Sequence, residues 1–451
     1  LDLEQRLAAL RQSSDAAAET SQLRLELDQA EAEWAAHRHD VARRSPVSEG
    51  VALPPAAIQA TLDGDEAVVG WCAADLGALG HRTWGFVLRA QGPVAWRELP
   101  DDDDAAPGSE EIRRLLSTPA SDAQRLRDDA RALHAARLAP LEPLLAGARA
   151  LIFIPSGDML GLPVEILRDP DDRLLDDRFA VSYAPSATIL GWLRGQSAAG
   201  EGSTARRALL VGDPPFHADH LAAMSDADED PSATRSAMEP TRSDSALAQL
   251  PRLAATRDEV EAVAAVWPDA TVLLGSAASE PALVELEASG ALGEYGIIHL
   301  ATHALVDDEA PGRSALVLAR TDLPDARDRA ASETRVIDGL VTATEIVREW
   351  DLNADLVVLS ACATGLGRKV AGEGYLGFSH AFLQAGAGGL VVSLWPVSDR
   401  STAILMERFH QNLAGGFADD RGAGPGQALG TATAMQEARR HLRELRTRGR
   451  R

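Results

Sequence analysis

Short apolar runs alternate with amphipathic stretches from residue 148 to the end of the chain. Continuous short apolar runs are typical of strands buried on both faces of a sheet, whereas the stretches between them repeat their apolar residues at helical spacing. The alternation predicts an α/β domain over residues 148–451. The expected strands lie in ALIFIPSGDMLGLPVEIL, ALLVGDPPF, ATVLLG, YGIIHLATHA, ADLVVLSAC and GGLVVSLWPV, and the expected helices in TRDEVEAVAAVW, EPALVELEASG and TATEIVREW.

The chain before residue 148 shows two other patterns. Over residues 1–46, leucines and Trp34 fall near helical spacing among alanines and glutamates, which predicts a helical segment that could end a helical repeat array. Residues 47–147 are expected to form an accessory region, with β-hairpins punctuated by glycine, an acidic linker, and helices over residues 109–147.

One stretch interrupts the α/β pattern. Residues 217–246 are polar, acidic and dotted with proline, with no apolar period. Such a composition cannot bury enough apolar surface to order itself, so we expect a mobile loop there.

Charge and cysteine content narrow the class of protein. The chain has 451 residues, 44 basic and 68 acidic side chains and a net charge of −24, and nucleic-acid binding needs clustered Lys and Arg, so we exclude it. Two cysteines exclude a disulfide scaffold. The sequence contains neither a stretch of roughly 18 apolar residues nor a signal peptide, so we expect a cytoplasmic protein without membrane contact. Because the chain begins with Leu1, we expect it to be part of a longer one.

Two expected strands end in reactive side chains: IIHLATH ends at His303 and LVVLSAC at Cys362. Sites in such sheets lie beyond the carboxyl ends of the strands, and a histidine about 50 residues upstream of a cysteine is a known nucleophile arrangement. The glycine-rich ATGLG after Cys362 permits a sharp turn with backbone N–H groups that can face an anion. From the residues alone, a space-filling cysteine and a hydrogen-bonded core histidine remain equally open interpretations.

Metal and nucleotide chemistry fit less well. HLATH places His299 and His303 four residues apart, but the zinc motif with that spacing needs Glu where this chain has Leu300, so we expect no metal and a packing role for His299. The segment GLGRKVAGEG has neither the phosphate-loop nor the dinucleotide-binding order, and no serine elbow occurs. We therefore expect no cofactor.

Several motifs, in order, resemble the CHAT family of caspase-like domains, which are related to separase and usually follow tetratricopeptide repeats. These motifs are IPSGDMLGLPVEIL, HLATHA, LVVLSACATGLG and GEGYLGFSHAFLQAGAGGLVVSLWPVSD. The resemblance covers residues 148–430 and implies a caspase-like sheet flanked by helices. It further implies a supporting, protease-like part over residues 148–205 and a catalytic part over residues 206–451.

The resemblance also implies a cysteine endopeptidase with His303 and Cys362 as its catalytic dyad, a protein or peptide substrate, and a regulatory protein bound by the N-terminal helical segment. Backbone N–H groups of Ala304 and Cys362 would bind the oxyanion. Asp399, which follows the last strand, would bind a substrate arginine before the cut. The other interpretation of Asp399 is a helix N-cap, because SDRSTAILMERF begins a helix there.

Two departures from the family pattern bear on activity. The chain has Ala304 where the family commonly has Gly, and Ala363 where it commonly has Glu. Alanine donates its backbone N–H as well as glycine does, unless the backbone needs a positive φ. Two other classes of function remain open: a catalytically inert pseudo-protease that serves as a protein-interaction module, and an acyl-transferring hydrolase of small substrates.

Overall fold

The architecture comes from a computed structural model that describes most of the chain. The described residues are 52–77, 81–100, 109–118, 122–199, 207–217, 220, 237–238, 247, 250–307, 309–321, 323, 337–361, 368–370, 374–395, 397–415 and 430–448. Contacts divide the chain into two units, Leu1–Pro54 and Pro55–Arg451, and every element described here belongs to the second. The predicted helical segment 1–46, and most of the predicted loop 217–246, lie outside the described residues.

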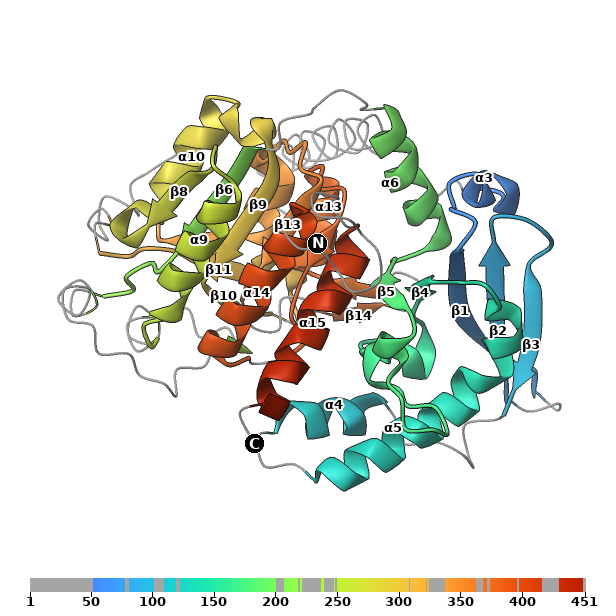
Figure 1. Ribbon diagram of the computed structural model, residues 1–451. Helices are drawn as coiled ribbons and strands as arrows, with labels where there is room; N and C mark the ends of the chain where they lie inside the picture. Colours follow the sequence, from blue (N-terminus) through green and yellow to red (C-terminus); the bar gives the residue numbers. More distant parts are fainter. Residues whose placement is uncertain are drawn as a thin grey trace, which may run out of the picture. The chain divides into compact units, whose positions relative to one another are not determined.

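A five-stranded parallel sheet with the order β16-β13-β9-β6-β8 forms the centre of the α/β part (Figure 1). Five of the predicted apolar runs form this sheet, which confirms the α/β prediction. The runs are apolar because strands inside such a sheet are covered on both faces. The strands are β6 (Arg207–Gly212), β8 (Thr271–Leu274), β9 (Tyr295–Ala301), β13 (Leu356–Leu359) and β16 (Leu390–Val391).

Helices cover both faces of this central sheet (Figure 1). Leu209 and Val211 of β6 point to a core shared with α10 (Glu280–Ala288), α12 (Ala343–Glu349) and α13 (Phe378–Gln384). Ala208 and Leu210 point to the opposite face, which α9 (Ala255–Val266) covers. On that face α14 (Asp399–Leu413) packs against α9, and α15 (Thr431–Arg448) packs against α14. The three helices predicted between these strands are confirmed as α9, α10 and α12.

His303 does not lie in the central sheet, contrary to the single strand predicted to end there. Strand β9 ends at Ala301, the hydroxyl of Thr302 donates to the carbonyl of Val317, and His303 opens β10 in a second sheet with the order β12-β11-β10-β7. The apolar run continues through the break because both strands are buried, so hydropathy alone cannot locate it. The strands are β7 (Ala237–Met238), β10 (His303–Leu305), β11 (Ala315–Val317) and β12 (Leu340–Thr342).

A third sheet with the order β3-β2-β1-β4-β5 combines strands from both sides of residue 147. Strand β1 pairs antiparallel with β2 and parallel with β4, so the boundary predicted at residue 147 does not separate two sheets. The physical reason is that β1 and β4 share one apolar core, in which Trp71 stacks on Phe153 at a centroid distance of 5.5 Å. The strands are β1 (Glu66–Asp75), β2 (His81–Arg89), β3 (Ala95–Leu99), β4 (Ala150–Ile154) and β5 (Ala180–Tyr183).

The remaining elements are short or peripheral. The glycine-rich segment after Cys362 contains an antiparallel hairpin of β14 (Arg368–Val370) and β15 (Gly374–Leu376). None of the described helices is both long and apolar enough to cross a membrane. The other helices are α3 (Pro55–Gln59), α4 (Ser109–Ser117), α5 (Ala123–Arg137) and α6 (Ala187–Ala199), with 3-10 turns η3 (Ala139–Leu145), η4 (Gly157–Met159), η5 (Val164–Ile166), η6 (Leu175–Asp177), η7 (Gly275–Ala277), η8 (Ala291–Glu294) and η9 (Pro311–Arg313).

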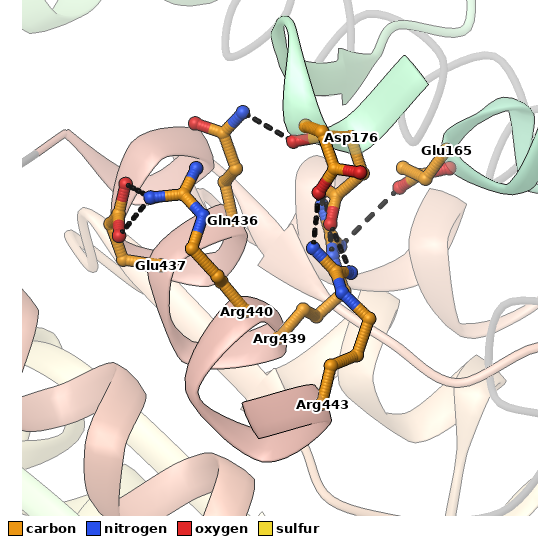
Figure 2. Close-up of polar contacts among 8 residues, drawn as sticks. Glu165, Asp176, Gln436, Glu437, Arg439, Arg440 and Arg443 are labelled. Carbon is orange, nitrogen blue, oxygen red and sulfur yellow. Dashed lines mark hydrogen bonds and ion pairs between the residues drawn. The ribbon is translucent and has the colours of Figure 1, made fainter. Parts of the chain in front are cut away.

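An ionic cluster holds α15 to the third sheet (Figure 2). Asp176 of η6 is 1% exposed and accepts from Arg439 at 2.6 Å and from Arg443 at 2.7 Å. Gln436 donates to the Asp176 carbonyl at 2.6 Å, and Arg439 also pairs with Glu165 at 3.4 Å. Three side chains of one helix face thus converge on one short turn beside β5.

Candidate active site

Three neighbouring strands of the central sheet end at the same level. Leu300 of β9 pairs with Val211 of β6 on one side and with Leu359 of β13 on the other. Because carboxyl ends of parallel strands meet at one edge, the residues that follow these strands are brought together there. Asp213 directly follows β6, His303 lies two positions after the end of β9, and in the sequence Cys362 follows Ser360 and Ala361 after β13.

Cys362 itself lies outside the described residues, but the backbone leading to it is described. The N–H of Ser360 donates to the carbonyl of Leu300 at 2.8 Å, so the chain still follows β9 past the end of β13. Ala361 is fully buried, and its carbonyl accepts from the hydroxyl of Ser393. The residue before Cys362 is thereby fixed just beyond the carboxyl end of β13.

The imidazole of His303 is fully buried and held by a backbone carbonyl. Its Nε2 lies 2.9 Å from the carbonyl oxygen of Pro251, and its ring centroid lies 5.1 Å from that of Phe216. A carbonyl oxygen only accepts, so Nε2 carries a hydrogen, and in the neutral ring Nδ1 is then the nitrogen that can take up a proton. The Pro251 carbonyl thus selects the Nε2–H tautomer of His303.

Ala304, the predicted oxyanion residue, is buried in β10 beside His303 and pairs with Leu316 of β11. Among the described residues, Asp172 and Asp213 are the non-glycine residues with a positive φ. Ala304 therefore has no need of the left-handed conformation that would call for glycine. Its departure from the family pattern leaves the backbone geometry unimpaired.

Asp399, the predicted specificity residue, is 3% exposed and opens α14. Its Oδ2 accepts from the backbone N–H of Ala255 at 3.0 Å, the first residue of α9. The N-cap of α9 is Ala254, whose side chain cannot accept, so Asp399 satisfies an N–H that would otherwise lack a helical partner. Ser398 is the N-cap of α14 but makes no side-chain capping bond, so Asp399 caps a neighbouring helix instead of its own.

The acidic loop after His303 has its own partners. Asp307 is 1% exposed, and it accepts from the backbone N–H groups of Glu309 and Ala310 and from Arg313. The N–H of Ala310 contributes most to a lowered pKa of this carboxyl, and Arg313 adds to it. Asp307 therefore stabilises the turn between β10 and β11.

A buried polar chain runs behind the strand ends on the α9 face. Trp267 donates to Nδ1 of His410 at 3.0 Å, and Nε2 of His410 lies 3.2 Å from Nδ1 of His299. Nε2 of His299 lies 2.9 Å from Oε1 of Glu259, which also accepts from the hydroxyl of Ser360 at 2.6 Å. Burial, together with His299, lowers the pKa of His410 well below its usual range, so the ring is neutral. Each N–H group of this chain then donates toward Glu259. Trp267 donates to His410, His410 to His299, and His299 to Glu259.

The CHAT-domain family model matches residues 127–448 of the chain. The chain belongs to the CHAT-domain family. The match confirms the resemblance carried by the sequence motifs and begins within α5, earlier than those motifs indicate. It thus includes the whole of the central sheet and both of its helical layers.

Among solved structures, this CHAT protein is similar to a chain of the Saccharomyces cerevisiae separase-securin complex. The two chains share 10% sequence identity with a TM-score of 0.44, and the similarity covers 86% of this chain and 30% of that chain. No match was found among curated proteins.

Cys72, the second cysteine of this CHAT protein, lies in strand β1 opposite Trp84 and is exposed. Partial burial raises the pKa of its thiol, which disfavours the reactive thiolate. Among the described residues, no three His, Cys, Asp or Glu side chains gather as metal ligands.

Sequence reasoning missed two features of this CHAT domain. Pro251 acts through a carbonyl that every residue possesses, so no sequence signal could have found it. Glu259 and His410 are polar residues at apolar-facing helix positions, and that misplacement in the helical pattern was a usable signal for a buried polar chain.

Proposed function

We propose that this CHAT protein is a cysteine endopeptidase that cuts a protein or peptide substrate. The Cys362 thiolate attacks the scissile carbonyl, His303 takes the thiol proton and gives it to the leaving amine, and water hydrolyses the thioester. An ordinary thiol pKa of about 8.5 leaves few thiolates at neutral pH, so the imidazole must stabilise the thiolate.

The observation that carries the proposal is the geometry at His303. A neutral imidazole with Nε2–H on the Pro251 carbonyl has Nδ1 as its basic nitrogen, and the parallel pairing of β9 with β13 brings the chain before Cys362 to the same edge. A base oriented by a third group beside a nucleophile is the general requirement of covalent catalysis by a thiol.

The remaining parts of the site follow from this assignment. Backbone N–H groups of Ala304 and Cys362 are proposed to bind the oxyanion, and Asp399 to bind an arginine before the cut through a charge-assisted pair. We further propose a cytoplasmic enzyme whose N-terminal helical segment binds a regulatory protein.

One observation favours the alternative of a catalytically inert interaction module. The imidazole of His303 is fully buried and Asp399 is 3% exposed, with its carboxylate on Ala255. Residues that only hold a fold together show this kind of burial.

A peptide assay distinguishes the two functions. Matched fluorogenic peptides with Arg, Leu, Met or Asp before the cut are incubated with the wild type, Cys362→Ala, Cys72→Ala and Asp399→Asn. We expect cleavage of the Arg peptide, a loss of at least ~1000-fold in kcat/KM for Cys362→Ala, and less than about twofold for Cys72→Ala. Asp399→Asn keeps an oxygen for Ala255 but removes the charge, so it should lower kcat/KM for Arg by ~10-fold or more with little effect on Leu.

Each part of the proposal can fail separately in this assay. Equal losses in both cysteine variants would mean that a stability effect had been mistaken for catalysis. Cleavage without a preference for Arg would leave Asp399 as a helix cap. No turnover of any peptide, with Cys362 unreactive to alkylation, would establish the inert module.

A further inference from the structure

Asp213 is a buried carboxylate at the carboxyl end of β6, next to β9 in the central sheet. It directly follows β6, is 1% exposed, and has a φ of +49°, a conformation that costs a non-glycine residue about 1 kcal/mol. Its Oδ1 accepts from Nε of Arg252 at 3.0 Å, and its Oδ2 accepts from Nη2 of Arg252 at 3.0 Å and from Nε of Arg257 at 2.9 Å. A bidentate ion pair of this kind fixes the orientation of the guanidinium as well as its distance from the carboxylate.

The neighbour of Arg252 is Pro251, whose carbonyl accepts from His303. The segment 251–257 is therefore held at Asp213 by its two arginines and touches the candidate base through Pro251. The same segment donates to Asp399 from the N–H of Ala255 at 3.0 Å. The segment 251–257 thus contacts Asp213, His303 and Asp399.

Two residues, Gly212 and Thr256, allow the start of α9 to lie this close to the end of β6. A Cβ on Gly212 would lie 3.0 Å from the carbonyl oxygen of Thr256 and 2.7 Å from Cγ2 of Val260, so only glycine lets α9 begin so near β6. The hydroxyl of Thr256 accepts from the N–H of Asp213 at 2.9 Å and donates to the carbonyl of Leu253 at 2.6 Å. The start of α9 therefore bonds to both the carboxylate and the backbone N–H of Asp213.

We propose that Asp213 and Arg252 form a positioning clamp for the Pro251 carbonyl and, through it, for the tautomer and orientation of His303. The inference rests on the proposed dyad and deepens it. A carbonyl has no side-chain rotamer with which to adjust, so its place depends wholly on how the backbone beside it is anchored. Without the clamp, the carbonyl shifts and Nε2 loses its acceptor, and Nδ1 is no longer fixed as the base.

Alkylation of Cys362 tests the clamp without a known substrate. The full chain carries Cys72→Ala so that one thiol remains, and iodoacetamide reaction rates are measured from pH 5 to 9. A thiolate stabilised by His303 reacts well below the ordinary thiol pKa of about 8.5. Arg252→Ala is compared with Arg257→Ala, because both side chains bind Asp213 but only Arg252 adjoins Pro251.

We expect Arg252→Ala to raise the apparent thiol pKa by about one unit and to slow alkylation at pH 7 by ~10-fold, and Arg257→Ala to change the rate less than twofold. Asp213→Asn, which tolerates the left-handed backbone, should resemble Arg252→Ala. Arg252→Lys keeps the charge but cannot form the bidentate pair, so its alkylation rate should lie between those of Arg252→Ala and the wild type. Circular dichroism and thermal unfolding identify any variant that fails to fold. If Arg252→Ala does not fold, the alkylation rates of Asp213→Asn and Arg252→Lys test the clamp instead.

The outcomes separate the clamp from the dyad. If His303→Ala raises the apparent thiol pKa but Arg252→Ala and Asp213→Asn leave it unchanged, the clamp is refuted and the dyad stands. Equal shifts in the Arg252 and Arg257 variants would show general loosening and refute the specific role of Arg252. If His303→Ala itself leaves the profile unchanged, both the dyad and the clamp are refuted.

Discussion

Glu259 accepts hydrogen bonds from both strands that lead to the candidate dyad. Its Oε1 contacts His299, four residues before His303, and Ser360, two residues before Cys362, and all three side chains are buried. Buried polar groups are costly unless every partner is present, and a complete network specifies one arrangement. The polar chain therefore fixes the relative position of β9 and β13 where the site begins.

Replacing Glu259 by alanine should destabilise the protein by roughly 3 kcal/mol, because a hydroxyl and an imidazole N–H lose their acceptor in a dry interior. The matched control is Glu261→Ala on the same helix, since its side chain is 59% exposed and its ion pair with Arg257 spans 3.8 Å. That control should cost less than about 0.5 kcal/mol. Urea unfolding followed by fluorescence measures both, and similar midpoints for the two variants would contradict the argument.

Glu280 predicts a pH dependence of stability. Burial raises the pKa of this carboxyl from 4.5 to about 7, with a further contribution from the charge of Asp338 and against the hydrogen bonds from the backbone N–H groups of Gly339 and Asp338. The folded state favours the protonated form, so this stabilisation is complete below pH 4.5 and is lost as the pH rises toward 7.

Glu280→Gln should remove that dependence, because the amide is neutral at every pH and its oxygen can still accept from Gly339. Relative to the variant, the wild type should lose about 2 kcal/mol between pH 5 and 7.5. Unfolding free energies at a series of pH values measure the difference. Parallel curves for the two proteins would show that the carboxyl group is ionised throughout.

The residues that bear chemistry were predictable to different degrees. The hydrophobic pattern predicts the strands β9 and β13 before His303 and Cys362, but it does not show that His303 opens a strand of a second sheet. Asp307 lies in an acidic loop of the sequence, DDE, yet it is buried and accepts hydrogen bonds from three residues, because the sequence does not show how a loop folds back on its own carboxylate. Contacts made by backbone groups, such as that of Pro251, leave no trace in the sequence.

At the scale of elements, the strands were predictable and their partners were not. An apolar run such as ALIFI identifies β4 as buried, but its pairing with both β1 and β5 depends on chain far away in sequence. The break between β9 and β10 is similarly hidden, since Thr302 is buried and lies between two buried residues, Ala301 and His303. Periodicity reports burial, whereas sheet membership is decided by tertiary contacts.

The helix α15 should depend on its ionic attachment to η6. Asp176→Asn keeps an oxygen but removes the buried charge that Arg439 and Arg443 share (Figure 2). Arg439 then keeps only its longer pair with Glu165, and Arg443 only its pair with the more exposed Asp177. We expect a loss of about 3 kcal/mol and faster amide exchange along the helix. Glu437→Gln is the control, because its partner Arg440 lies three residues away in the same helix, and it should leave exchange beside η6 unchanged. Equal exchange in both variants would mean that α14 alone holds α15.

At the scale of the whole molecule, the second unit contains its own cores. The clusters on both faces of the central sheet and the core of the third sheet are built from residues after Pro54. We therefore expect a chain that begins at Pro55 to fold alone, with a Tm within about 3 °C of the full-length value. Differential scanning calorimetry of the two chains measures this, and a much lower Tm would show that the first unit completes a core.

The same truncation tests the regulation proposed for the N-terminal segment. If residues 1–54 hold the site in an unproductive state, removing them should raise the rate of peptide cleavage and of Cys362 alkylation at least several-fold, with the Tm unchanged. Alkylation is the more direct readout, because it reports on the thiolate without depending on substrate choice. The matched control is the truncated chain with Cys362→Ala, which should neither cleave nor label at that position. Equal rates for the intact and truncated chains, with no effect of a binding partner, would contradict regulation through this segment and favour an enzyme whose site is permanently assembled.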